Sequence, residues 1–304
     1  MHISRILCPH TPQTHTNFNF IDIRTDGDTR LFTDPLRIAY LAQLRGAASV
    51  IKSMNESLED FYRELHHAYF TDDTERIYHL LNHAHEINAT RLGYSSTSRG
   101  KGSSREGLVA TLQPFQEFVQ MGIPFENISD MAVVIDNFDA DRLSDMTTNI
   151  IFSHLAEFTV SVCDKYGYPV QDISRRGYRY WCSKSNDWQS YEGQCLVIDG
   201  KVILLTPKEI VVKGLAYNTE SYFSRVIVTS YQERQTTRGK DGKVSKPNRK
   251  YIRKKLLQEK STHDWAVDTV VEKPDSIIRG RREAMARIDF DGLSDVLLDK
   301  IAYD

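Results

Sequence analysis

The sequence predicts an α+β protein with a mixed β-sheet core flanked by helices, an N-terminal helical region and a basic helical C-terminal region. Helical spacing of apolar residues dominates the first third of the chain. A hairpin signal, Asp199-Gly200 between two apolar runs, marks the centre. Helical patterns rich in Lys and Arg follow residue 231. We therefore expect three parts in one compact unit, covering residues 1–92, 105–230 and 231–304.

The N-terminal region begins with a predicted strand and turn over residues 19–34, where β-forming residues precede an Asp-Gly-Asp turn. Pro35 follows Asp34, an arrangement typical of the start of a helix. Two more helices are predicted over residues 57–70 and 72–87, because apolar side chains recur there every three or four positions.

The middle region opens with residues 93–105, which are rich in Gly and Ser and carry three bases and no acid. This segment leads into a helical pattern over residues 105–120, a geometry that presents backbone N–H groups to an anion. Arg99 and Lys101 are therefore candidate nucleic-acid contacts. The alternative is a surface loop without a ligand.

An apolar run at residues 131–135 predicts a short strand, and residues 143–165 predict one long helix that Gly167 ends. Aromatic-rich strands are expected at 178–181 and 188–191, and a hairpin is expected from 194–198 and 202–205. The C-terminal third predicts a helix over 218–231 capped by Asn218, a strand at 265–271 and helices within 274–301.

The net charge of −2 conceals a strong segregation of charge along the chain. Residues 107–172 hold ten acids and two bases, a balance of −8. Residues 231–260 hold eleven bases and three acids, a balance of +8. A local excess of bases is the footprint of a phosphate-binding surface, although a solvated loop would show the same composition. Candidate nucleic-acid contacts in this stretch are Lys250, Arg253, Lys254 and Lys255.

Four aspartates, Asp136, Asp139, Asp141 and Asp145, crowd the predicted junction between the 131–135 strand and the long helix. Crowded carboxylates repel one another unless a cation joins them, and oxygen ligands suit Mg²⁺. The alternative is structural, since Asp at the start of a helix caps free N–H groups. Asp145 or its neighbour Ser144 could serve as such a cap.

The motifs Glu192-Gly-Gln194 and Thr206-Pro-Lys208 enter and leave the predicted hairpin. An acid before a hairpin and a lysine at the end of its second strand resemble the core of PD-(D/E)XK nucleases. The resemblance covers residues 130–213 and implies a catalytic set of Asp145, Gln194 and Lys208. It also implies a Mg²⁺ site formed by Asp141, Asp145 and Glu192. Thr206 stands where that family has an acid, which favours a protein without catalytic activity.

Two further patterns involve aromatic residues and histidines. Arg175 and Arg176 precede the aromatic run 178–181, so these side chains could hold phosphates and stack bases, or the aromatic rings could pack internally. His79 and His83 have the i, i+4 spacing of paired zinc ligands, but no glutamate lies between them, which excludes an HExxH protease. They are read as surface histidines, and the N-terminal Cys8 and His15 as incidental.

Together these patterns predict a Mg²⁺-dependent nuclease or nuclease-like subunit that acts on DNA or RNA. The alternative is a non-catalytic nucleic-acid-binding or adaptor subunit of a phage-defence complex, with a larger protein or a second copy as partner. A third hypothesis is a small-molecule enzyme or sensor that binds a nucleotide phosphate at residues 93–104. No apolar run approaches the ~18 residues of a membrane helix, so we expect a cytoplasmic protein with no membrane partner and free thiols.

Overall fold

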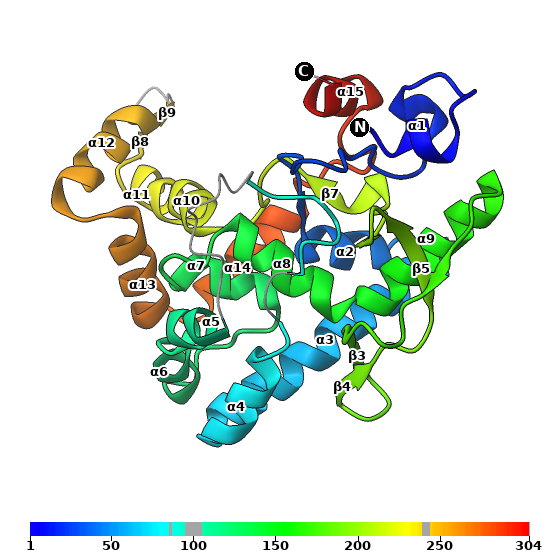
Figure 1. Cartoon of the computed structure of the whole chain (residues 1–304). Coiled ribbons are helices and arrows are strands. Elements are labelled where there is room, and N and C mark those ends of the chain that lie inside the picture. The colour runs from blue at the N-terminus through cyan, green and yellow to red at the C-terminus, as the bar shows by residue number, and fades with distance from the viewer. Residues whose placement is uncertain (85–86, 95–104, 239–243, 304) are drawn as a thin grey trace.

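The computed structural model describes residues 1–84, 87–94, 105–238 and 244–303. Helices make up most of the molecule, and the strands form small separate sheets, with β3, β4 and β5 on one side and β8 and β9 beside α12 on the other (Figure 1). The α+β class is therefore confirmed. Every pairing between named strands is antiparallel, in the orders β1-β7, β2-β5-β6, β3-β4 and β8-β9.

The N-terminal part is helical from residue 35 onward. Its elements are α1 (Ser4–Leu7), the 3-10 turn η1 (His15–Asn17), β1 (Phe32–Thr33), α2 (Pro35–Ala42), α3 (Ser49–Phe70) and α4 (Thr74–Leu81). Asp34 caps α2 by accepting a hydrogen bond from the Leu36 N–H, as the Asp-Pro pair predicts. The predicted strand over 19–34 shrinks to β1. The segment opposite Phe20 carries Pro207, which has no backbone N–H to donate to a strand pairing. Only an isolated bridge between Phe20 and Pro207 forms there.

The middle part contains three corrections to the predicted elements. Its helices are α5 (Arg105–Leu112), α6 (Phe115–Gln120), the 3-10 turn η2 (Ile128–Asp130), α7 (Met131–Val134), α8 (Ala140–Ile150) and α9 (Phe152–Tyr166). The predicted strand at 131–135 is wrong. A capping box between Asn127 and Asp130 starts a helical turn that α7 continues. Pro114 divides the predicted 105–120 helix into α5 and α6.

The predicted long helix over 143–165 is also two helices, because the chain bends at Ile151. Ile150, Ile151 and Phe152 all have side chains with no solvent exposure. Gly167 ends α9 in the left-handed conformation at φ 66°, as predicted.

The strands follow the predicted hairpins closely. They are β2 (Gln171–Asp172), β3 (Arg179–Cys182), β4 (Asp187–Ser190), β5 (Gln194–Ile198), β6 (Lys201–Ile203), β7 (Val211–Val212), β8 (Thr237–Arg238) and β9 (Val244–Ser245). Asp199 and Gly200 both have positive φ, at 50° and 76°, which is the geometry of a type I′ turn. A 3-10 turn, η3 (Lys208–Ile210), separates β6 from β7.

The described C-terminal part is helical apart from the short paired strands β8 and β9. Its helices are α10 (Thr219–Tyr222), the π-helix η4 (Phe223–Ile227), α11 (Val228–Arg234), α12 (Arg249–Glu259), α13 (Thr262–Glu272), α14 (Ser276–Met285) and α15 (Asp295–Tyr303). Asn218 caps α10 as predicted. The predicted strand at 265–271 is wrong. Ser261 caps helix α13, which buries Ala266 and Val270 one turn apart.

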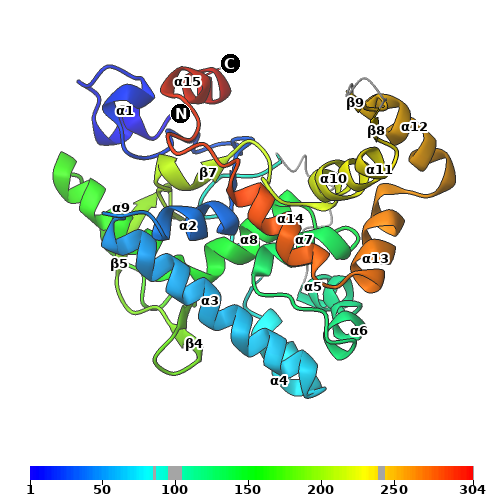
Figure 2. The same cartoon turned by 180° about the vertical axis from the view of Figure 1, so that it is seen from behind.

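The C-terminal helices are built into the main core. Arg281 of α14 is 6% exposed and forms ion pairs with Asp130 of η2 and with Glu126. The chain then returns to the N-terminus, so that α15 lies beside α1 while α12 projects on the opposite side (Figure 2). All four cysteines are free, and Cys8, Cys163 and Cys195 are buried. Among the described residues, no helix has the length and apolar character needed to cross a membrane.

Candidate functional site

Lys208, the predicted catalytic lysine, lies at the start of η3 and is engaged within the protein. Its Nζ donates to the backbone oxygen of His15 at 2.9 Å and to Oδ1 of Asp295 at 2.6 Å. Asp295 is the first residue of α15. This cation therefore holds the C-terminal helix to the N-terminal segment.

The acidic run is divided between capping and loop contacts. Asp139, not Asp145 or Ser144, is the cap of α8, and it accepts a hydrogen bond from the Arg142 N–H at 3.2 Å. Asp141 is half-buried and accepts a bond from the Tyr94 N–H at 3.2 Å, and burial raises the pKa of its carboxyl. Asp145 lies in the middle of α8 and is partly exposed.

The second group of predicted ligands lies elsewhere. Glu192 is exposed at the rim of an open hollow of about 910 Å³ that it shares with His154 of α9. Gln194 begins β5 and pairs with Asp172 of β2. Within the described ranges, no three His, Cys, Asp or Glu side chains are grouped so that they could hold a metal ion. Asp141, Asp145 and Glu192 are therefore not assembled into a site, and the Mg²⁺ centre stays a prediction.

His79 and the aromatic run of the middle region have internal roles. His79 Nε2 lies 2.7 Å from Asp187 Oδ1, so this histidine joins α4 to β4. Trp181 and Trp188 are almost fully buried and pack edge-on against Phe61. The aromatic rings of this segment thus contribute mainly to the core.

The bases predicted to contact nucleic acid before residue 231 differ in how the structure places them. Arg176 donates from Nη1 to the Gly200 oxygen at 2.6 Å, while Arg175 is exposed. Arg99 and Lys101 lie outside the described residues. Among the described bases predicted as contacts before the C-terminal third, Arg176 is bound to a backbone oxygen and Arg175 is exposed near Asp172.

Helix α12 is fastened to the molecule along one side. Ile252 and Leu256 are each 2% exposed and lie one turn apart. Arg249 donates to Thr229 Oγ1 at 2.9 Å and to the Ser224 oxygen at 2.6 Å. Arg253 forms a bidentate pair with Glu220 at 2.6 and 3.0 Å, and its guanidinium lies over the Phe223 ring. Both arginines therefore serve the fold, including Arg253, which the sequence placed among the nucleic-acid contacts.

The other side of α12 is an exposed basic surface, which we call the α12 lysine face. It comprises Lys250, Lys254, Lys255 and Tyr251, all exposed. The Tyr251 side chain is 66% exposed. In the part of the chain that the structure describes, no carboxylate lies within 4.0 Å of the three ammonium groups. The charge of this surface is therefore not neutralised by a described acid.

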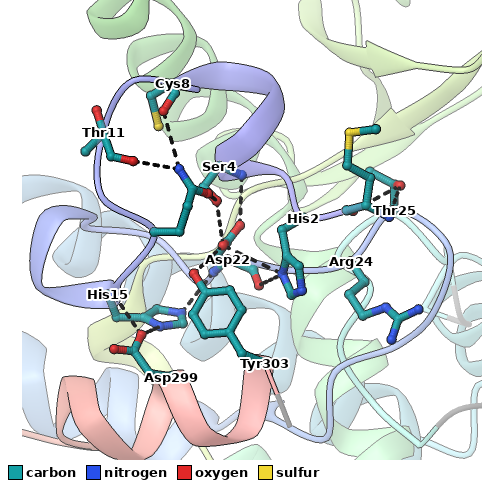
Figure 3. A network of polar contacts seen from close by, with 12 residues as sticks. His2, Ser4, Cys8, Thr11, His15, Asp22, Arg24, Thr25, Asp299 and Tyr303 are labelled. Carbon is teal, nitrogen blue, oxygen red and sulfur yellow. Dashed lines mark hydrogen bonds and ion pairs between the residues drawn. The ribbon is translucent and has the colours of Figure 1, made fainter.

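A buried polar cluster at the two ends of the chain is a feature that sequence reasoning missed (Figure 3). Asp22 has no exposure, and its carboxylate accepts hydrogen bonds from the Ser4 N–H at 2.8 Å, the Ser4 hydroxyl at 2.6 Å and the Tyr303 hydroxyl at 2.6 Å. Burial and the adjacent Asp22 carboxylate raise the pKa of Tyr303 well above its usual value.

The second half of this terminal cluster is built on His15, which is also fully buried. Its Nε2 accepts a bond from the Asp22 N–H at 3.1 Å, so the proton lies on Nδ1, which donates to Asp299 Oδ1 at 2.6 Å. Thr14 donates to the other oxygen of Asp299 at 2.5 Å. Both ring nitrogens of His15 therefore form hydrogen bonds within the protein. We call this cluster, which joins the two ends of the chain, the terminal clasp. No spacing in the sequence could signal contacts between residues 281 and 284 positions apart.

These features define an α+β protein whose ends are joined by a buried polar cluster and which carries an exposed basic surface on α12. A family model described as a domain of unknown function (DUF8370) matches residues 11–218, and the chain belongs to that family. No curated protein and no solved structure matches the chain. The matched segment ends at Asn218, so α12 and its lysine face lie beyond it.

Proposed function

We propose that this protein binds nucleic acid through the α12 lysine face, as a binding or adaptor subunit. The observation that carries the proposal is the concentration of three exposed lysines on one side of a helix with no described carboxylate to neutralise them. Lysines in such an arrangement gain free energy by releasing counterions from a phosphate backbone. An adaptor role also implies a second partner, either a larger protein or another copy of the chain.

The geometry favours this function over a nuclease. Lys208 is hydrogen-bonded to Asp295 and to the His15 backbone. Thr206, at the position where PD-(D/E)XK nucleases have an acid, is buried. Asp141 contacts the Tyr94 backbone, whereas Glu192 borders a separate hollow. Lys208 and Glu192 border two different hollows, and among the described residues no three His, Cys, Asp or Glu side chains are grouped to hold a metal ion.

The test is a Lys250/Lys254/Lys255→Ala variant measured by fluorescence anisotropy with labelled DNA and RNA over a range of salt concentrations. We expect weaker binding and a salt dependence less steep by about two to three units of log Kd per log salt, one for each lost phosphate contact. The matched control is Lys52/Lys184/Lys201→Ala, which removes three exposed lysines from α3, the β3–β4 turn and β6. Both variants should keep the parent's stability to within about 0.5 kcal/mol.

Binding by the α12 variant that equals the parent's at every salt concentration would overturn the proposal. A separate assay addresses the nuclease function. Mg²⁺-dependent cleavage by the parent that is lost in Asp141→Asn would restore that function in place of the adaptor role.

A further inference from the structure

Tyr251 occupies the middle of the α12 lysine face. It lies three and four residues before Lys254 and Lys255, the spacing at which helical side chains are neighbours. The buried residues Ile252 and Leu256 point to the opposite side of the helix. The phenol ring therefore lies on the same side of the helix as the three lysines and faces solvent.

Other tyrosines of the C-terminal part are used differently. Tyr217 and Tyr222 are 1% exposed, and their hydroxyls bond to the Ile277 oxygen at 2.7 Å and to Ser276 at 2.5 Å. Tyr251 is 66% exposed, and no described residue hydrogen-bonds its hydroxyl or stacks on its ring. Its flat aromatic surface is therefore available to a ligand.

We propose that the α12 lysine face binds single-stranded nucleic acid, with Tyr251 stacking on an unpaired base while the lysines contact phosphates. This inference rests on the proposed function and specifies its ligand. Unpaired bases expose their faces to aromatic side chains, whereas the bases of a duplex are already stacked on one another. Lys250 and Lys254 lie one turn apart, about 6 Å along the helix axis, so they can contact different phosphates of one strand.

The anchoring of α12 supports this use. Arg249 and Arg253 fix the N-terminal half of the helix to η4 and α10. At the C-terminal end, Trp265 Nε1 donates to the Leu256 oxygen at 2.9 Å. Because the helix is held before the ligand arrives, little ordering is needed on binding, which favours affinity.

The experiment compares Tyr251→Ala and Tyr251→Phe with the parent, using labelled oligothymidine alone and annealed to oligoadenine, and the corresponding RNA strands. We expect Tyr251→Ala to weaken single-strand binding by ~5- to 100-fold, the range for loss of one stacked base, and duplex binding by less than about twofold. Tyr251→Phe keeps the ring and should bind like the parent. The control is Tyr78→Ala, which removes a 44% exposed tyrosine from α4.

Two results would overturn the inference. One is unchanged single-strand binding by Tyr251→Ala, and the other is an equal loss on single strand and duplex. Vesicles containing phosphatidylserine provide a further comparison. If the parent binds them as tightly as oligothymidine and Tyr251→Ala weakens both equally, the surface serves an anionic membrane instead.

The failures of the two proposals can be distinguished. If the lysine variant binds like the parent, the proposed function fails together with this inference. If the lysine variant loses binding while Tyr251→Ala does not, only the single-strand specificity fails.

Discussion

Helices α12 and α14 are both short and basic, and both lie in the C-terminal third, but the protein uses their cations in opposite ways. Arg281 of α14 is buried and pairs with Asp130 and Glu126. Lys250 and Lys254 of α12 are exposed and have no described acidic partner. The difference shows that the density of basic residues in a helix does not determine whether its cations are neutralised within the protein. The position of the nearest carboxylate decides this for Arg281.

The buried Arg281–Asp130 pair and the α12 lysines also differ in the free-energy cost of keeping their charges in the folded protein. Asp130 is fully buried, and burial raises the pKa of its carboxyl to about 6, even though the Arg281 guanidinium acts in the opposite direction. Desolvation therefore outweighs the attraction between these two groups. The lysines of α12 remain hydrated, so their charges cost little until a ligand displaces the water and counterions.

The largest expected effect is that of removing the buried cation. Arg281→Met should lower the free energy of unfolding by about 3–5 kcal/mol, because Asp130 would remain buried without its partner. The matched control is Arg279→Met in the same helix. Arg279 is 57% exposed and lies 4.0 Å from Glu283, so its loss should cost less than about 1 kcal/mol. Urea unfolding measures both, and equal losses would contradict the contrast between buried and exposed cations.

The pH dependence of stability should carry the signature of Asp130. Its pKa is raised in the folded state, so its contribution to stability is greatest below the unfolded value and is lost as the pH rises through about 6. The change is about 3 kcal/mol. The measurement is urea unfolding of the parent and Asp130→Asn at about pH 4 and about pH 7. The parent should lose more stability than the variant over this interval, and parallel behaviour would refute the assignment.

A smaller effect separates the two kinds of cation within α12 itself. Arg253→Ala should cost about 1 kcal/mol of stability, because it removes the Glu220 ion pair and the contact with the Phe223 ring. Lys254→Ala should leave stability unchanged and weaken nucleic-acid binding. Thermal unfolding and anisotropy on the two single variants test this. A larger binding loss for Arg253→Ala than for Lys254→Ala would show that the ion pair opens to the ligand.

Features encoded by adjacent residues could be predicted from the sequence. Asp34-Pro35 begins a helix, Asp199-Gly200 closes a hairpin, Asn218 caps a helix and Gly167 ends one. Each depends on backbone conformations and hydrogen bonds within a few residues. The α12 lysine face was likewise visible as a local excess of bases, although its ligand stays a prediction.

Elements and contacts that depend on distant residues could not be predicted in this way. Apolar runs at 131–135 and 265–271 fit either a buried strand or a buried helix, and the fold made both helical. Lys208 pairs with Asp295, 87 residues away, a contact that no local pattern signals, and its catalytic role stays a prediction.

The sequence by itself determined the α+β class, the local caps and turns, and the segregation of charge. Only the tertiary structure decided that His15, Asp22, Asp299 and Tyr303 form a terminal clasp, that Arg253 and Arg281 serve the fold, and that Lys250, Lys254 and Lys255 face solvent. The physical reason is that a side chain's role depends on its burial and on the charges near it. Both are set by residues that the fold brings together across long stretches of the chain.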